Sequence, residues 1–197
     1  MTFQLLKIII KQVKLIFLMF KVIIKDNIIE HCKTQIQKFN FGNRGVADGT
    51  KAQQLTGIIG ESVVANLFGL PLIDGSGGFD YGEDLKYNNL VIDVKTMGRT
   101  TDVRPYYVNN FIGLQKKYKT DIYIFTSINQ KTNELTVCGW IDKKLLFDKA
   151  SFFPKGTFRF RSDKSKFKTF TDLYEISNKD LFQISSIDDL KKQLNKY

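Results

Sequence analysis

The sequence predicts an α/β domain in which a mixed central β-sheet is flanked by helices on both faces. Three observations predict it: two amphipathic helical segments, a hairpin pattern in the middle of the chain, and a buried apolar strand after the hairpin. Of the 197 residues, 43% are hydrophobic and 25% are charged, so the chain can bury the core of one ordinary globular domain.

Helical periodicity marks two segments before the hairpin. Asp26 or Asn27 is the expected N-cap of a first helix, whose apolar stripe extends to about Phe39. A second helix is expected from about Lys51 to Phe68, because a glycine follows at position 69, where helices commonly end.

The strand pattern begins with a hairpin. Leu85–Tyr87 and Leu90–Thr96 are joined by Asn88-Asn89, and asparagine tolerates the positive φ angles of a two-residue turn. Asp121–Ser127 is an apolar run typical of a buried strand, and Leu135–Trp140 is expected to pair with it. We expect the hairpin at the centre of the sheet.

The first 25 residues are rich in Leu, Ile and Phe but are interrupted by lysines. Their longest uncharged run is six residues, far short of the roughly 20 that a membrane span needs, and no signal-peptide cleavage site follows. Phe20–Ile24 resembles a short strand. The segment before it is an amphipathic helix, an extra strand or a translated upstream extension with the true start at Met19, and the last two are favoured.

The net charge and the counts of cysteine and histidine limit the kinds of partner and catalytic chemistry that the chain can support. The net charge of +10, with a pI near 9.5, favours a polyanionic partner such as nucleic acid, although a basic surface also serves solubility. Cys32 and Cys138 give no disulfide framework, so an intracellular setting is expected. With His31 as the one histidine, the available chemistry is that of carboxylates, lysine and hydroxyls.

The hairpin register places charged residues together. If Asn88 and Asn89 form the turn, Asp84 lies opposite Asp93, and strand alternation puts Lys95 on the same side. Two opposed carboxylates repel, and an oxygen-coordinated Mg²⁺ would relieve the repulsion. The alternative is that Asp84 caps the strand in solvent while Asp93 simply pairs with Lys95.

Glu61 lies in the apolar stripe of the second predicted helix, with Ile58, Ala65 and Phe68. An acid on a buried helix face normally requires a partner or a metal ion. The alternative is a glutamate at the edge of the stripe that reaches water.

In order along the chain, these elements resemble the PD-(D/E)xK nuclease superfamily, which has the restriction-endonuclease-like fold. The resemblance covers about Gln53–Phe125 and rests on a helix with G-x-x-G-E (Gly57–Glu61), an acid in the following loop, and a strand reading IDVKT (Ile92–Thr96). No proline precedes Asp80 or Asp84, where the family often has one. Asp84, nine residues before Asp93, is preferred on register, and Asp80, 13 residues before it, is the reserve.

The resemblance implies a function and a site. The predicted catalytic residues are Glu61, Asp84, Asp93 and Lys95, and the predicted metal ligands are Glu61, Asp84 and Asp93, with Asp80 in reserve. The cofactor would be Mg²⁺, with Mn²⁺ as a substitute, and the reaction would be phosphodiester hydrolysis. A glutamine on the helix predicted at 111–118, Gln115, matches one that helps some members hold DNA.

The expected partner is DNA, with RNA not excluded, no membrane, and a homodimer left open. Residues 1–25 would be an N-terminal extension, 26–150 the nuclease core, and 151–197 a basic addition packed on the same domain. The alternatives are a non-catalytic nucleic-acid-binding protein that retains the nuclease fold, and a scaffold protein whose basic surface is incidental.

The addition contains a basic segment, Lys155–Lys168, with six basic residues interleaved with phenylalanines. Its alternation predicts a strand with a basic face suited to phosphates, and Lys155, Arg159, Arg161, Lys164 and Lys166 are the candidate contacts. An edge strand protected by charge is the alternative.

Overall fold

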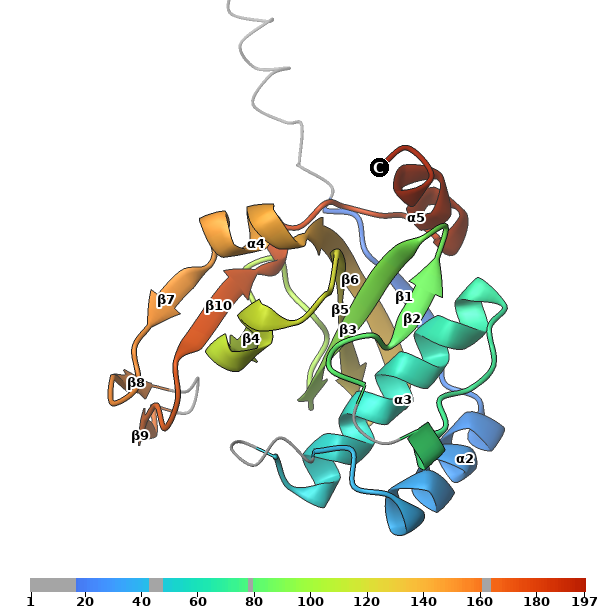
Figure 1. Ribbon diagram of the computed structural model, residues 1–197, viewed down its shortest axis with the longest axis horizontal. Coiled ribbons are helices and arrows are strands. Elements are labelled where there is room, and N and C mark those ends of the chain that lie inside the picture. Colours follow the sequence, from blue (N-terminus) through green and yellow to red (C-terminus); the bar gives the residue numbers. More distant parts are fainter. Residues whose placement is uncertain (1–16, 43–47, 78–79, 161–163) are drawn as a thin grey trace, which may run out of the picture.

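A computed structural model of the protein describes residues 17–42, 48–77, 80–160 and 164–197. Its centre is a five-stranded sheet with the order β1-β6-β5-β3-β2 (Figure 1). The strands are β1 (Phe20–Ile23), β2 (Leu85–Tyr87), β3 (Leu90–Arg99), β5 (Ile122–Asn129) and β6 (Glu134–Asp142). Because β3 and β5 run parallel while the other pairs are antiparallel, the sheet is mixed, as predicted.

Two helices cover one face of this sheet: α2 (Asp26–Lys38) and α3 (Lys51–Phe68) (Figure 1). Both predicted helices are confirmed, α3 at both ends and α2 to within a residue at its C-terminal end. Thr50 and Gln53 form a capping box at the start of α3, and Gly69, with φ of 78°, ends it in the left-handed conformation. In α2, Lys25 takes the N-cap position, so the N-cap predicted at Asp26 or Asn27 is wrong by one or two residues.

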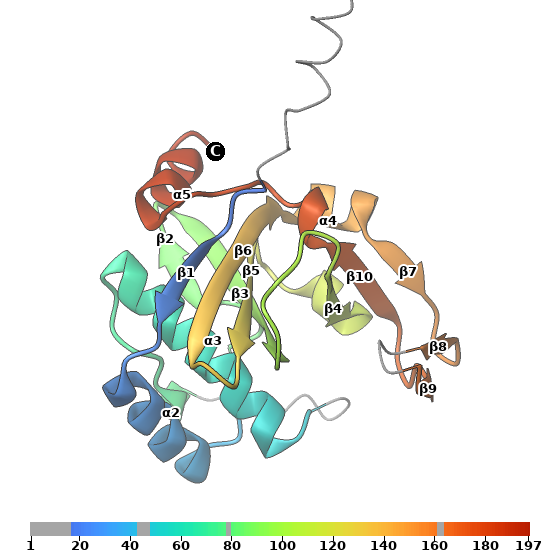
Figure 2. The same cartoon turned by 180° about the vertical axis from the view of Figure 1, so that it is seen from behind.

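The opposite face is covered mainly by a second, three-stranded sheet with the order β4-β10-β7 (Figure 2). Its strands are β4 (Val108–Ile112), β7 (Ser151–Phe153) and β10 (Leu173–Ser177), with α4 (Lys143–Lys149) beside them. Phe111 and Ile176 of this layer pack on Tyr123 and Phe125 of β5 in a core of their own. Among the described residues the long helices therefore flank one face, and the other face is covered by aromatic strands and the short helix α4 where helices were predicted.

The β2–β3 hairpin has the predicted register and turn. Leu85 pairs with Ile92 and Tyr87 with Leu90, and Asn88 and Asn89 have φ of 48° and 65°. The hairpin lies at an edge of the sheet, however, so the expected central position is wrong. Strand β3 pairs with β5, and β5 pairs with β6 on its other side. The central strand of the five is therefore β5.

Both ends of the described chain join the same body. β1 pairs with β6, so residues 20–23 of the predicted N-terminal extension belong to the central sheet, and residues 1–16 lie outside the described part. From the predicted C-terminal addition, β10 pairs with β4, and α5 (Ile187–Leu194) buries Leu190 and Leu194 in the main core. No helix in the described ranges is long and apolar enough to cross a bilayer.

Close packing of α3 on β3 makes Gly60 a critical position. A Cβ on Gly60 would lie 1.9 Å from the Thr96 Oγ1 and 2.8 Å from the Thr96 Cβ, and Thr96 is held by a hydrogen bond from Thr126. Rotation of Thr96 therefore does not relieve the clash. We expect Gly60→Ala to lower the free energy of unfolding by about 1–3 kcal/mol in urea titrations.

Gly57→Ala is the matched control for this prediction. A Cβ there would lie 3.6 Å from Glu61 Oε1, which is an ordinary contact, so the better helix propensity of alanine should stabilise the protein by roughly 0.5–1 kcal/mol. Equal effects of the two substitutions would contradict the close approach of α3 to β3.

Candidate functional site

Three carboxylates converge at the end of the β2–β3 hairpin that lies away from its turn: Glu61, Asp80 and Asp84. One oxygen of each lies within 4.8 Å of the others. Glu61 reaches this point from α3, where its stripe neighbours Ile58, Ala65 and Phe68 are all buried. Asp84 immediately precedes β2, and its Oδ2 accepts a hydrogen bond from the Val94 backbone N–H at 2.7 Å.

Asp80 comes from the loop before β2. Its Oδ1 accepts a hydrogen bond from the Gly82 N–H at 2.9 Å, which fixes the carboxylate above the strand end. The two candidates for the first acid, Asp80 and Asp84, therefore both join the cluster. Their spacing to Asp93 allowed either of them as the first acid, with Asp84 preferred, and the structure brings both to Glu61.

Asp93 and Lys95 form an ion pair on β3, next to the cluster. Asp93 is fully buried and its Oδ1 accepts a hydrogen bond from the Lys95 Nζ, whose side chain is 16% exposed. The Asp93 Oδ2 is also buried and, with the carboxylates ionised, has no hydrogen-bond partner among the described residues. Asp93 thus pairs with Lys95 and lies outside the group of three acids, whereas the sequence placed it among the ligands.

Burial and mutual repulsion make the ionised cluster unfavourable. The pKa of Asp84 is raised well above its ordinary range, first by burial and then by Glu61, Asp93 and Asp80, against the opposing effect of Lys95. Burial also raises the pKa of Asp93, which the Lys95 ammonium offsets in part. Asp84, beside Asp93, also acts to lower the pKa of Asp93. A proton or a cation at this site would therefore reduce the repulsion between the carboxylates.

The donor set fits a hard divalent cation. Glu61, Asp80 and Asp84 supply only carboxylate oxygens, which Mg²⁺ and Mn²⁺ prefer, and no histidine or cysteine belongs to the group among the residues the structure describes. Burial and the neighbouring carboxylates raise the pKa of Asp84, so a bound cation would favour its charged form. Glu61, Asp80 and Asp84 are therefore the residues that would hold a metal ion.

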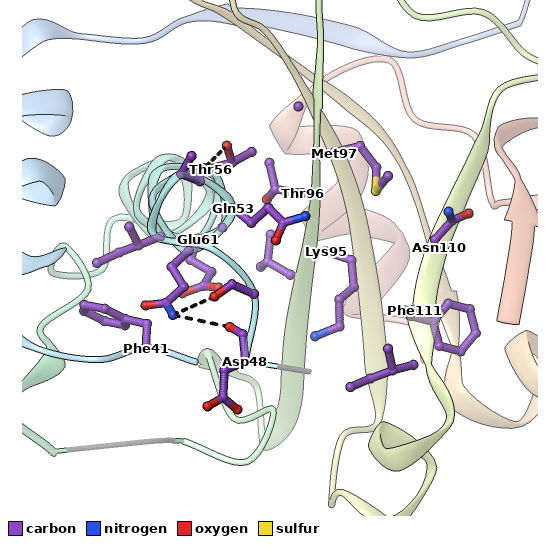
Figure 3. Close-up of a pocket in the computed structure, with 18 of the residues that line it drawn as sticks. Phe41, Asp48, Gln53, Thr56, Glu61, Lys95, Thr96, Met97, Asn110 and Phe111 are labelled. Atoms are coloured by element: carbon purple, nitrogen blue, oxygen red, sulfur yellow. Dashed lines mark hydrogen bonds between the residues drawn. The ribbon is translucent and has the colours of Figure 1, made fainter. Parts of the chain in front are cut away.

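A pocket of about 580 Å³ opens beside this cluster, between α3, β3 and β4 (Figure 3). Glu61 and Lys95 both line it, and Figure 3 shows the Lys95 side chain extending from β3 into the space between α3 and β4. Glu61 of the cluster and the Lys95 ammonium therefore face a space large enough for a nucleotide-sized group.

The wall opposite α3 carries two amides. Gln115 is only 4% exposed, Asn110 lies on β4, and neither side-chain oxygen has a hydrogen-bond partner in the described part of the chain. Gln115 was singled out from the sequence, but its predicted helix is a short 3₁₀ helix, Gly113–Lys117, after β4. Asn110 was missed; its signal was a polar residue beside an apolar one in a strand, Asn110 before Phe111.

The basic segment forms a separate two-stranded hairpin of β8 (Phe158–Phe160) and β9 (Lys166–Lys168). Arg159 Nη2 pairs with Glu175 Oε2 at 2.6 Å, and its guanidinium lies 3.8 Å from the centre of the Phe153 ring. Arg159 is therefore held against the second sheet, and its role as a phosphate contact stays a prediction. Arg161, a further predicted contact, lies outside the described residues.

Comparison with known proteins gives no family or function for this chain, so its function has to be inferred from its own residues. No family model, no curated protein and no solved structure matches this chain.

Proposed function

We propose that the protein is a metal-dependent nuclease with a restriction-endonuclease-like fold, and that it hydrolyses phosphodiester bonds, foremost in DNA. The observation that carries the proposal is the convergence of three carboxylates, Glu61, Asp80 and Asp84, next to a lysine on the wall of one pocket. The order helix, acid, hairpin and Asp-x-Lys supports it, as does a mixed sheet with α3 packed on the hairpin strand.

Glu61, Asp80 and Asp84 would hold the cation in this proposal. When bound, Mg²⁺ polarises a phosphoryl oxygen and stabilises the negative charge of the transition state. Asp84 keeps its orientation through the Val94 N–H and Asp80 through the Gly82 N–H, so two of the three ligands are fixed by backbone donors. Such support from outside the coordinating atoms is typical of built metal sites.

Lys95 is the proposed catalytic cation, and Asp93 is a positioning residue. The buried Asp93 carboxylate holds the Lys95 ammonium at the pocket wall, where it can donate a hydrogen bond to the attacking water or to a phosphate oxygen. In hydrolysis the water oxygen forms a bond to phosphorus, the bond to the leaving ribose oxygen breaks, and a proton passes to that oxygen. The ammonium stabilises charge that develops during this step.

Nucleic acid fits the rest of the pocket and the charge of the chain. The amides of Asn110 and Gln115 present polar atoms that suit the sugar and base edges of a nucleotide. The net charge of +10 favours the binding of a polyanion such as nucleic acid. The same features fit a nucleic-acid-binding protein that retains the fold without cleaving, so cleavage itself is the property to test.

The direct test is incubation of the purified chain with supercoiled plasmid, linear duplex, single-stranded DNA and RNA, each with Mg²⁺, Mn²⁺ or EDTA. We expect cleavage of DNA with Mg²⁺ or Mn²⁺ and none with EDTA. Binding without cleavage under all metal conditions would instead establish the non-catalytic alternative. Cleavage that persists in EDTA would contradict the metal site.

A further inference from the structure

One face of the β8–β9 hairpin combines exposed aromatic rings with lysines. Phe158 pairs with Lys168 and Phe160 with Lys166, and directly opposed residues point to the same side of a sheet. Phe158, Phe160, Lys166 and Lys168 therefore share one face, which we call the aromatic–basic face. All four residues are exposed, and the two rings are 56% and 67% exposed.

The other face of this hairpin fixes its orientation. Arg159 and Phe167 point the opposite way and are half-buried, and Arg159 forms its ion pair with the buried Glu175 of β10 while stacking on Phe153. Contacts with the second sheet therefore hold the hairpin so that the Phe158 and Phe160 rings point outward. The hairpin lies at the far end of β7 and β10 in both views (Figures 1 and 2).

Two exposed phenylalanines in one three-residue strand are costly to leave in water, and their neighbours indicate what covers them. Lys166 Nζ lies 4.0 Å from the centre of the Phe158 ring, and Lys168 Nζ lies 5.7 Å from the same centre. A purely apolar partner would have to desolvate these ammonium groups. A partner with flat apolar rings and regularly spaced negative charges satisfies both kinds of side chain.

We propose that the aromatic–basic face binds single-stranded nucleic acid, with unpaired bases stacked on Phe158 and Phe160 and phosphates against Lys166 and Lys168. In a duplex the faces of the bases are covered by their neighbours, so the rings select a strand whose bases are unpaired. Phe170, two residues beyond β9, is itself exposed and lines the candidate active-site pocket. The chain that leaves the hairpin therefore reaches the wall of the pocket two residues later.

Resting on the proposed nuclease function, this inference names the substrate class: DNA or RNA with an unpaired segment beside the cleaved bond. The binding step requires no metal, so it can be measured in EDTA, where no cleavage is expected. The test is fluorescence anisotropy of a labelled oligo-dT strand and of a matched duplex in EDTA, with the full chain.

Phe158→Ala/Phe160→Ala should weaken binding of the single strand about tenfold or more, since each base stacked on an aromatic ring contributes roughly 5- to 150-fold. Duplex binding should change less than threefold. Tyr197→Ala is the matched control, because Tyr197 is 62% exposed at the C-terminus, beyond α5 and far from the hairpin in both views, and its loss should leave single-strand binding unchanged.

Lysine variants separate stacking from charge. Lys166→Gln/Lys168→Gln should lower the log–log salt slope for single strands by about 1.4, at about 0.7 for each phosphate contact, whereas the phenylalanine variant should keep the wild-type slope. Unchanged single-strand affinity of the phenylalanine variant would overturn the proposal. So would equal losses for strand and duplex, or light scattering in which that variant turns a dimer into a monomer, since the rings would then join two copies of the chain.

Failure of this inference is distinct from failure of the proposed function. If the hairpin variants bind like wild type while metal-dependent cleavage is seen, the nuclease stands and the hairpin does not select its substrate. If single-strand binding depends on the rings but no cleavage is seen with any metal, the binding face stands and the nuclease fails.

Discussion

Removal of the Lys95 ammonium is expected to reduce DNA cleavage by about 100- to 10,000-fold, the usual range for loss of a group that handles charge or protons in a transition state. Lys95→Ala alone leaves the fully buried Asp93 without its cation, which destabilises the fold. The variant of choice is therefore Asp93→Asn/Lys95→Met, which removes both charges together and keeps side chains of similar size.

This double variant should fold, and it should still bind Mg²⁺, because Glu61, Asp80 and Asp84 remain. Turnover under saturating DNA and Mg²⁺ is the readout, with Mg²⁺ binding followed by calorimetry. Lys86→Ala is the control: Lys86 lies on the same hairpin but is exposed, and its ion pair with Glu83 is a surface contact. Cleavage at the wild-type rate by the double variant would show that the Asp93–Lys95 pair is only structural.

Mg²⁺ should raise the melting temperature of the wild-type protein by about 5–10 °C at a concentration 100 times its dissociation constant. Ligand at that excess stabilises a fold by about 2.7 kcal/mol, and for about 200 residues each kcal/mol corresponds to roughly 2–4 °C. Asp84→Asn should abolish most of this shift, because it removes one of three converging ligands. Glu83→Gln changes the adjacent acid, which pairs with Lys86 and lies outside the three-acid cluster, and should leave the shift intact.

Without metal, the same substitution should act in the opposite direction. The pKa of Asp84 is raised in the folded protein, so the folded state binds the proton more tightly than the unfolded chain does. The stability that this proton confers is complete below about pH 4, the ordinary value for aspartate, and is lost as the pH rises through the raised folded-state pKa.

Asp84→Asn is uncharged at every pH, so in EDTA it should melt above wild type at neutral pH and approach wild type in acid. Thermal melts from pH 4 to pH 8, with and without Mg²⁺, test both effects in one series. A metal-free Asp84→Asn protein that melts below wild type at neutral pH would show that the carboxylate is needed for the fold and is not a strained ligand.

The local elements could be predicted from the sequence because their signals are short-range. Helical periodicity and Gly69 defined α3, and Asn88-Asn89 fixed the register of the hairpin, since a two-residue turn leaves one pairing of the strands. From that register alone, Asp84 and Lys95 were placed on the same patch of the molecule, and the apolar stripe of α3 pointed Glu61 at the sheet. These side chains do gather at one place.

Tertiary structure decided how these charges divide and what surrounds them. Strand alternation allowed Asp93 to pair with Lys95, and the burial of Asp93 between neighbouring strands selects that pair. The loop before β2 brings Asp80 to Glu61 and Asp84, an outcome that has no periodic signal. The covering of the second face by β4, β7 and β10 depends on strands far apart in the chain. The sequence likewise predicted Arg159 as part of a basic surface, and the fold pairs it with Glu175, 16 residues later. Periodicity reports which face of an element is apolar, whereas partners of buried charges depend on contacts between elements that the local sequence does not encode.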